Sequence, residues 1–517
     1  MLQREALTEP RAWKQRIRSA GARVAELAHG TRLRGDVASS SFDSLGAERR
    51  TRALWKDGWP SRPAGWPRRR LPMSDSRATP SRRRLEYPKA APADRLTHYL
   101  FRYPAKFHAP VVKQLIQDYT AEGAVLYDPF CGSGTLLVEA LVEGRSAIGS
   151  DVDPVAVFVS RVKSTPLKEQ TLRRDLATLQ ESMDVHRRSA ADYERLQWQD
   201  LSDRVFARER EQVWLPAIPN LEHWFRRYVL IDLGRMLAVI QNAPVSLGAR
   251  RFFSLVFASI VRGVSNADPV PVSGLEVTSH MKRRDAEGRL VDPFRQWDNA
   301  AKRAITQMTA FSKVAQPGAR ASAFNADATS LPAKLVRRRV DAVITSPPYH
   351  GAVDYYRRHQ LEMYWLQLIA DHEERLDLLQ RYIGRTKVAG RHPLLSEPFA
   401  LPLTEERVEA KMREVSGPRA DAFRHYCVAM SRVFAELAKV LPEGAPALFV
   451  VGHSVWRGTS LNTSDLFAEL SQPFFRLDEV LDYPVKNRYM SYARRNGASI
   501  DHEYVLVLQR TSSSLDT

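Results

Sequence analysis

The stretch Asp128-Pro129-Phe130-Cys131-Gly132-Ser133-Gly134-Thr135 decides the fold. The apolar run Ala-Val-Leu-Tyr before it predicts a buried strand, and Leu-Leu-Val-Glu-Ala-Leu after it predicts a helix. The two glycines allow a sharp turn in which backbone N–H groups can approach a ligand closely. A strand, a glycine turn and a helix in this order are typical of nucleotide-like cofactor sites, although a plain strand-helix corner has the same pattern.

Two carboxylates follow the next predicted strand, Ser146-Ala147-Ile148-Gly149. Asp151 and Asp153 therefore lie at a strand C-terminus, where open α/β sheets bind their ligands. An acidic side chain at this place can accept hydrogen bonds from both hydroxyls of a ribose. The alternative is that one of them caps the helix that starts at Pro154, and each residue can have one of the two roles.

A second short motif, Ser346-Pro347-Pro348-Tyr349, follows the predicted strand 340–344. An exocyclic amino group is a weak nucleophile because its lone pair is delocalised into the ring. The Ser346 hydroxyl and the Pro347 carbonyl can each accept one of its N–H groups, and the prolines hold these acceptors in place because their φ is fixed. The Tyr349 ring offers a surface on which a flipped base can stack. A Pro-Pro turn that only ends a buried strand is the alternative.

Together these motifs resemble those of the S-adenosylmethionine-dependent DNA methyltransferases that methylate cytosine N4 or adenine N6. The resemblance implies that the tetrad 346–349 receives the target base and that the glycine loop 128–135 holds the methionine end of the cofactor. It further implies that Asp151, with Asp153 beside it, holds the ribose and that Asp327 contacts the adenine amino group. Lys106 and Phe107 belong to a segment, 103–110, that resembles the one folded over the methionine moiety in this family.

Cysteine usage excludes a rival chemistry. Methylation at cytosine C5 needs a thiolate nucleophile, and the chain has only two cysteines, Cys131 in the glycine loop and Cys427 in a predicted helix. Neither lies in a Pro-Cys turn, so we expect direct transfer to nitrogen with catalysis mainly by positioning. Two cysteines cannot form a zinc cluster, and we expect no metal site.

The spacing of the motifs predicts the domain organisation. Asp153 and Asp327 are 174 positions apart, whereas a helical crossover between parallel strands needs about a dozen residues. We therefore expect a mainly helical insert, residues 166–319, within a catalytic domain formed by residues 96–165 and 320–510. The expected fold class is α/β, with the Rossmann-like, seven-stranded, mostly parallel sheet of class I methyltransferases. Residues 477–485 and 503–508 are expected to form an edge hairpin.

The charge distribution agrees with a nucleic-acid partner. The chain has 77 Lys and Arg against 59 Asp and Glu, a net charge of +18. Residues 1–95 alone hold 22 basic and 10 acidic residues, so this Pro- and Arg-rich extension is either a DNA-tracking arm or a solvated, partly disordered tail. The stretch 252–261 is expected to be buried, and its ten residues are too few to span a bilayer. No secretory segment opens the chain, and we expect a cytoplasmic protein.

The sequence therefore predicts a site-specific DNA methyltransferase of a restriction-modification or related defence system, with a separate endonuclease as its partner. Cytosine N4 is favoured as the target because Ser opens the tetrad, and adenine N6 is the nearest alternative. Two more distant hypotheses are an RNA guanine-N2 methyltransferase and a non-enzymatic DNA-binding protein. Two regions are candidates for reading the DNA: the insert, with Arg262–Pro269 and Lys282–Arg284, and the segment 370–420.

Overall fold

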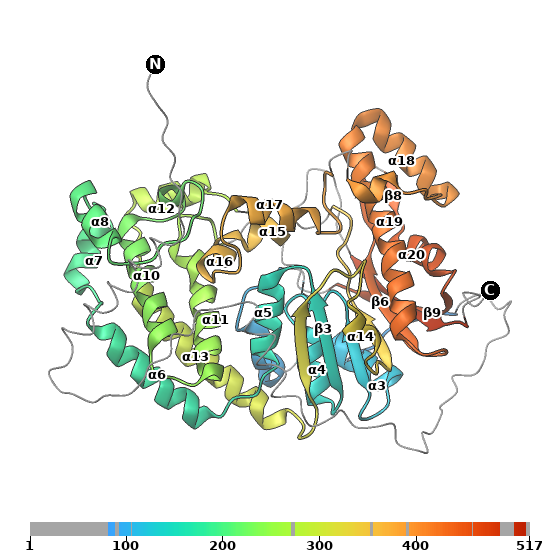
Figure 1. Cartoon of the computed structure of the whole chain (residues 1–517), viewed down its shortest axis with the longest axis horizontal. Helices are drawn as coiled ribbons and strands as arrows, with labels where there is room; N and C mark the ends of the chain where they lie inside the picture. Colours follow the sequence, from blue (N-terminus) through green and yellow to red (C-terminus); the bar gives the residue numbers. More distant parts are fainter. Residues whose placement is uncertain are drawn as a thin grey trace. The chain divides into compact units, whose positions relative to one another are not determined.

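The computed structural model describes residues 81–87, 92–104, 106–269, 275–351, 355–388, 392–456, 459–485 and 501–512 (Figure 1). All of them belong to residues 79–517, the second of two units into which the chain divides. Residues 1–80, most of the predicted basic extension, lie outside the described ranges. In the described part of the chain, no helix combines the length and the apolar character that crossing a membrane would need.

Within the described residues, the largest sheet has eight strands. Its strands follow the spatial order β1-β9-β10-β6-β5-β2-β3-β4. The bounds are β1 Ser81–Arg84, β2 Val125–Asp128, β3 Ser146–Asp151, β4 Ala321–Asn325, β5 Ala342–Thr345, β6 Pro446–Gly452, β9 Phe475–Pro484 and β10 His502–Arg510. A separate two-stranded sheet pairs β7, Ser454–Trp456, with β8, Thr459–Leu461.

The direction of the strands creates a functional rim. Strands β4, β3, β2, β5 and β6 are parallel neighbours, and β10 runs antiparallel between β6 and β9. The C-terminal ends of the five parallel strands therefore lie along one edge of the sheet. Asp128, Asp151 and Thr345 end three of these strands. This is the edge at which open α/β sheets bind ligands.

The sheet confirms a mostly parallel Rossmann-like fold, but the predicted number of seven strands is wrong. The eighth strand is β1, which pairs in parallel with β9 from Ser81 opposite Glu479 to Arg84 opposite Asp482. It lies within residues 1–95, whose composition predicts an arm or a tail. This charged segment can form a strand because the backbone provides the hydrogen bonds to β9. In addition, Arg83 is neutralised by Glu479, with 2.9 Å between Arg83 Nε and Glu479 Oε1. Strands β9 and β10 pair as predicted, but the outermost strand on their side of the sheet is β1.

Residues 166–319 form helices over most of their described length. These are α6 Glu169–Asp184, α7 Ala190–Leu196, α8 Asp203–Arg210, α9 Leu221–Trp224, α10 Arg227–Asn242, α11 Leu247–Val264, α12 Ser279–Ala286 and α13 Pro293–Val314. Their apolar faces share one buried cluster with α5, Pro154–Lys163, and α16, Gln360–Trp365. These helices thus pack directly against α5 and α16.

The remaining helices flank the sheet or follow the tetrad. They are α3 Ala109–Tyr119, α4 Thr135–Val142, α14 Ala333–Val336, α15 Tyr355–Arg358, α17 His372–Gln380, α18 Leu403–Val415, α19 Gly417–Val440 and α20 Thr463–Ser471. Two 3-10 helices are also present, η1 Pro92–Tyr99 and η2 Pro393–Ser396. Helix α4 is buried along most of its length because it lies between two cores: Leu136 and Leu137 join one cluster, and Val138 and Leu141 the other.

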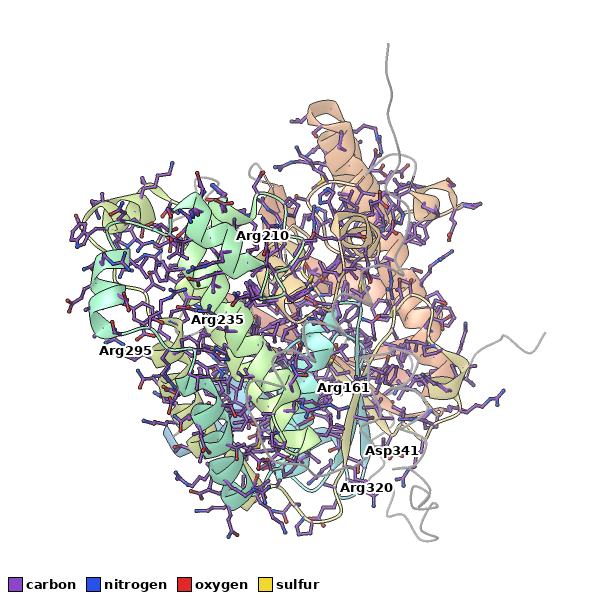
Figure 2. The ribbon with its side chains drawn as sticks, turned by 60° about the vertical axis from the view of Figure 1, so that its left-hand side comes forward. Arg161, Arg210, Arg235, Arg295, Arg320 and Asp341 are labelled. Atoms are coloured by element: carbon purple, nitrogen blue, oxygen red, sulfur yellow. The ribbon has the colours of Figure 1, made fainter. Side chains whose placement is uncertain are left out.

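Many arginines of the insert are paired with neighbouring acids. Figure 2 labels Arg210, Arg235 and Arg295 on its helices. Arg235 lies 3.3 Å from Glu209, and Arg295 lies 3.9 Å from Asp292. Local pairing of this kind reduces the charge that these side chains offer to a distant phosphate.

Candidate active site

The glycine loop connects β2 to α4, as the sequence predicts, and glycine is required at its last turn position. Gly132 and Gly134 have φ angles of +46° and +74°, and a Cβ at Gly134 would lie 2.9 Å from Cα of Ser160. The loop is tied to the next strand by a hydrogen bond from Cys131 N to Ser150 O, 3.0 Å. A second tie comes from α5, where the buried Lys163 ammonium donates to Ser133 O at 2.6 Å.

Asp151 and Asp153 take different roles. Asp153 caps α5, because its Oδ1 accepts hydrogen bonds from Val155 N, 2.8 Å, and Ala156 N, 3.4 Å. Asp151 instead faces the glycine loop, accepting from Gly132 N and from Asp153 N, both at 2.9 Å. Each Asp151 oxygen has a further lone pair, so this carboxylate can still accept from a ligand hydroxyl.

The two sequence motifs meet at the rim of the sheet. Strands β2 and β5 are neighbours, with Leu126 opposite Ala342 and Tyr127 opposite Val343. At their C-terminal ends, the buried Thr345 hydroxyl donates to Asp128 Oδ1 at 2.7 Å. The residue that follows Thr345 is Ser346, so the predicted base seat begins next to the glycine loop.

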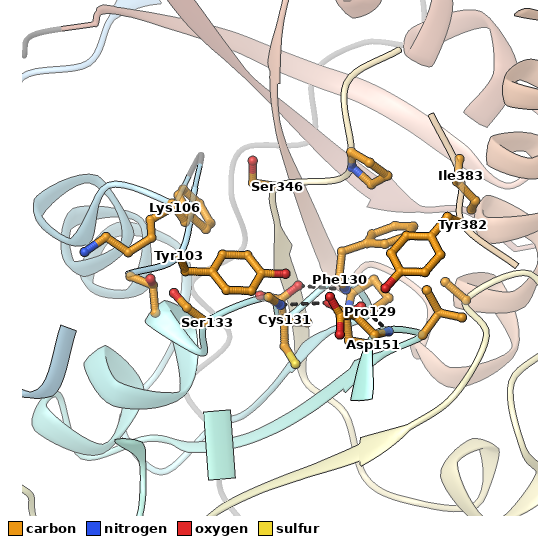
Figure 3. A pocket seen from close by; sticks show the side chains of 18 of the residues that line it. Tyr103, Lys106, Pro129, Phe130, Cys131, Ser133, Asp151, Ser346, Tyr382 and Ile383 are labelled. Carbon is orange, nitrogen blue, oxygen red and sulfur yellow. Dashed lines mark hydrogen bonds between the residues drawn. The ribbon is translucent and has the colours of Figure 1, made fainter. Parts of the chain in front are cut away.

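A hollow at this rim collects most of the predicted site residues (Figure 3). Those that line it are Lys106, Phe107, Asp128, Pro129, Phe130, Cys131, Gly132, Ser133, Thr135, Asp151, Asp153, Asp327, Ser346 and Pro348. Gly134, Pro347 and Tyr349 do not line it: Gly134 is the N-cap of α4, and Pro347 is buried.

Several residues that line the hollow were not predicted as site residues. Tyr103, Val152 and Ala328 adjoin predicted positions, and Tyr103 begins the segment 103–110 that carries part of the family resemblance. Arg381, Tyr382 and Ile383 come from the segment after α17. No motif signals these three residues, because only the fold brings them to the hollow.

Tyr349 is held by a carboxylate of the antiparallel strand. Its hydroxyl donates to Glu503 Oε1 at 2.9 Å, and the Tyr483 hydroxyl donates to Glu503 Oε2 at 2.5 Å. Glu503 lies on β10, 154 positions from Tyr349 in the sequence. One carboxylate from a distant strand therefore fixes the direction of the Tyr349 ring.

Burial changes the protonation of the hollow. Desolvation raises the pKa of Asp128 to about 7, against the lowering effect of its hydrogen bonds from Thr345 and Phe130. Desolvation, together with the charge of Asp153, raises the pKa of Asp151 to about 7. At the other end of the hollow, desolvation lowers the pKa of Lys106 to about 8.

The two cysteines are poor candidates for a nucleophile. Both are buried, and burial raises the pKa of the Cys131 and Cys427 thiols well above the usual value. The Cys131 side chain packs on Gly149 of β3. A Cβ added at Gly149 would lie 2.8 Å from the Cβ of Cys131. Within the described ranges, no group of three His, Cys, Asp or Glu side chains could hold a metal ion.

The two regions predicted as candidates for reading DNA differ in surroundings. The turn 262–269 is bonded both to its own region and beyond it: Asn266 Nδ2 donates to His223 O at 3.1 Å, and Arg262 Nη1 donates to Arg358 O at 3.3 Å. Lys282, Arg283 and Arg284 are exposed on α12. The segment 370–420 contributes residues 381–383 to the hollow itself.

The donors and acceptors of the hollow fit S-adenosylmethionine. Asp151 at the end of β3 offers acceptors for a ribose, and Asp327 offers an acceptor for an amino group. Lys106 lines the opposite end, with its ammonium donating to His98 O at 3.1 Å and lying 3.8 Å from the centroid of the Tyr99 ring. At Gly132 a Cβ would lie 3.3 Å from the Tyr103 ring, so the glycine keeps the space over the loop open.

Comparisons with known proteins agree with this site. The family model N6_N4_Mtase, described as DNA methylase, matches residues 35–160. The type II methyltransferase M.MvaI of Kocuria varians is 24% identical over 448 residues, which cover 80% of this chain and 91% of that protein. The type II methyltransferase M.AvaI of Nostoc sp. is 23% identical over 405 residues, 74% of this chain and 80% of that protein.

Two solved structures align with much of the chain at low similarity. The rRNA methyltransferase aviRa from Streptomyces viridochromogenes aligns with 83% of this chain and 93% of its own, at 14% identity and a TM-score of 0.27. TrmN from Thermus thermophilus aligns with 78% of this chain and 48% of its own, at 9% identity and a TM-score of 0.25.

The sheet and its glycine loop define a class I methyltransferase. Within that class, the chain is similar to the amino-methylating DNA methyltransferases in its two motifs, and residues 35–160 match their family model. S-adenosylmethionine is accordingly its methyl donor.

Proposed function

We propose that the chain methylates cytosine N4 at a specific DNA sequence, as the modification enzyme of a restriction-modification system. The observation that supports this most strongly is the convergence of Asp128 and Thr345, which puts the cofactor loop and the tetrad on one hollow. The relatives named type II methyltransferases support the modification role, with a cognate endonuclease as a separate partner.

The chain's own residues orient the amino group. Ser346 is half-buried and lines the hollow, so its hydroxyl oxygen can accept one amino N–H at the place where the methyl donor binds. The Pro347 carbonyl can accept the second N–H. With both N–H groups directed at acceptors, the nitrogen lone pair is held toward the hollow. S-adenosylmethionine supplies, when bound, an electrophilic methyl carbon on a sulfonium.

Access to the amino group requires the base to leave the duplex, and Tyr349 suits this step. The Glu503 bond holds its ring, and the adjacent Pro348 lines the hollow. A flat ring in a fixed direction can replace part of the stacking that a flipped base loses. In this proposal the residues 346–349 are catalytic, and Lys106, Phe107, loop 128–135, Asp151, Asp153 and Asp327 bind the cofactor.

The nature of the first tetrad residue favours cytosine N4. Ser346 offers a neutral hydroxyl, whereas an Asp at this place would offer a stronger, charged acceptor. Adenine N6 is the second candidate, because the family matched by the chain includes both targets. The exposed cations Lys282, Arg283 and Arg284 are our candidates for phosphate contacts from the insert.

Single-base modification mapping of DNA from cells that express the chain tests the proposal. We expect N4-methylcytosine in one sequence context, and none from cells that express Ser346→Ala or Tyr349→Ala. N6-methyladenine in one context would transfer the assignment to the second candidate. Unmodified DNA together with methylated RNA would refute the proposal.

A further inference from the structure

Four consecutive residues after α17 connect the cofactor hollow to the base seat. Arg381, Tyr382 and Ile383 line the hollow. The next residue, Gly384, lies against the backbone of Tyr349 and the ring of Pro348. We call residues 381–384 the bridging segment.

Tyr382 is the residue of the bridging segment that lies in the cofactor hollow. Its side chain is buried, and the charges of Asp153 and Asp151 act on its hydroxyl. Figure 3 shows the ring across the hollow from Lys106, with the hydroxyl directed toward the Asp151 side. Burial and the charges of Asp153 and Asp151 raise the pKa of this hydroxyl well above its usual value, so it remains a neutral donor. The ring thus faces the end of the hollow that offers acceptors for a ribose.

Gly384 is the residue of the bridging segment that contacts the base seat. It has a φ of +82°, and a Cβ there would lie 3.1 Å from Tyr349 O and 3.3 Å from Pro348 Cβ. Its carbonyl accepts a hydrogen bond from Gly351 N at 3.0 Å. Because the two chain segments touch at this point, a displacement of the bridging segment displaces Pro348 and Tyr349 as well.

We propose that Tyr382 is a further cofactor-binding residue, at the adenosine end, and that the bridging segment couples cofactor binding to binding of the target base. A ligand packed on Tyr382 holds Gly384 in its contact with Pro348 and Tyr349, and so keeps the seat in its receptive form. This inference rests on the proposed function, because the base seat is part of it. By linkage, the cofactor and the target DNA each strengthen binding of the other by the same factor.

S-adenosylhomocysteine is a suitable probe, because it fills the cofactor site without transferring a methyl group. Its affinity for the full chain is measured by calorimetry. The affinity for a duplex that contains the mapped target is measured by fluorescence anisotropy, with and without saturating S-adenosylhomocysteine. For the wild type we expect tighter DNA binding with the probe, by roughly 5- to 150-fold, the usual range of such coupling.

Tyr382→Phe tests the cofactor contact, since it removes only the hydroxyl. We expect S-adenosylhomocysteine to bind roughly 5-fold or more weakly, as for the loss of a buried hydrogen bond of about 1 kcal/mol or more. Tyr193→Phe is a matched control, because its hydroxyl donates to Asp232 at 2.9 Å within the insert. The control is expected to bind the probe as the wild type does. Probe affinities within about twofold of the wild type for both Tyr382→Phe and Tyr382→Ala would overturn the cofactor contact.

Gly384→Ala tests the coupling. The added methyl group pushes against Tyr349 O, so DNA binding should lose its response to the probe while probe affinity changes little. Gly318→Ala is the matched control, because Gly318 has a φ of +89° and nothing within 4 Å of its Cβ position. It has the same backbone strain without the contact, and we expect it to retain wild-type coupling. Full coupling in Gly384→Ala would overturn the role of the bridging segment.

Two results distinguish a failure of the coupling from a failure of the proposed function. A wild type that methylates its target, yet binds DNA equally well with and without the probe, would overturn only the coupling. A wild type that modifies no DNA would refute the proposed function itself.

Discussion

Thr345 donates its hydroxyl to Asp128 Oδ1 at 2.7 Å, and this buried hydrogen bond joins the strand that ends at the base seat to the strand that ends at the cofactor loop. The same oxygen accepts from Phe130 N at 3.0 Å, which shapes the first turn of the loop. A single carboxyl oxygen therefore fixes the loop and the tetrad relative to each other.

Thr345→Val should damage both stability and catalysis. Valine has nearly the shape of threonine but cannot donate, so Asp128 loses one of its two partners in a buried place. We expect the free energy of unfolding to fall by about 1–3 kcal/mol. We expect the methylation rate to fall on the order of tenfold, because a small displacement between donor and acceptor groups is costly. Urea unfolding and single-turnover methylation check this, and Thr345→Ser, which keeps the hydroxyl, should restore most of both.

The raised pKa of Asp128 predicts how stability depends on pH. The native carboxyl has a pKa of about 7 against an ordinary value of 3.8, so the native state holds a proton that the unfolded chain releases between these values. The contribution of this group to stability is therefore complete below about pH 4 and is lost as the pH rises through 7. It amounts to at most about 4 kcal/mol, at about 1.4 kcal/mol for each unit of pKa.

Asp128→Asn removes this titration while keeping a side chain of the same shape. Unfolding free energies of the wild type and the variant, measured from about pH 5 to about pH 8, should therefore diverge, with the wild type losing stability relative to the variant. Asp151 titrates in both proteins, so its effect largely cancels in the difference. Parallel pH profiles would contradict a raised pKa at Asp128.

Cofactor affinity should also depend on pH, through Asp151 and Lys106. Ribose hydroxyls donate best to an ionised carboxylate, so affinity should rise as the pH increases through about 7, where Asp151 loses its proton. Above about 8 Lys106 loses its charge, and affinity for a carboxylate-bearing ligand should fall. Calorimetry with S-adenosylhomocysteine should thus show a maximum between these values. Asp151→Asn should bind more weakly and lose the rise on the acidic side, whereas an unchanged rise would argue against this assignment.

Sequence alone predicts the parts of the site that are contiguous in the chain. The loop 128–135 and the tetrad 346–349 each contain their own turn residues and their own chemistry, and strand ends in a parallel sheet meet at one rim. The division of labour between Asp151 and Asp153 does not follow from sequence, because capping and ligand contact use the same residue type. Only the hydrogen bonds of Asp153 to α5 separate the two roles.

The contributions that sequence does not predict come from long-range pairing. Tyr382 reaches the hollow from a loop without a motif, and Glu503 reaches Tyr349 because β10 returns antiparallel beside β6. Strand β1 is unexpected for a different reason. Its Ser-Arg-Arg-Arg composition is typical of a solvated tail, but an edge strand needs only backbone bonds and a counterion such as Glu479.

Glu503 should act as a positioning residue for Tyr349. In Glu503→Gln the charged acceptor becomes a neutral amide, so the bonds from the Tyr349 and Tyr483 hydroxyls weaken. We expect a several-fold lower methylation rate, nearly unchanged affinity for S-adenosylhomocysteine, and a weaker signal from 2-aminopurine placed as the target base. Tyr349→Phe should show the same defects, and the double variant should be no worse than either single one. Additive losses would show that the two residues act independently.

The central claim is that cofactor and base meet at one rim, where the methyl group passes directly to an amino nitrogen. The most direct measurement supplies the purified chain with S-adenosylmethionine that has a deuterated methyl group, and then identifies the labelled nucleoside from DNA by chromatography and mass spectrometry. We predict label on an exocyclic amino group, cytosine N4 first, and none with Ser346→Ala. Label on cytosine C5, or label that persists without Ser346, would contradict it.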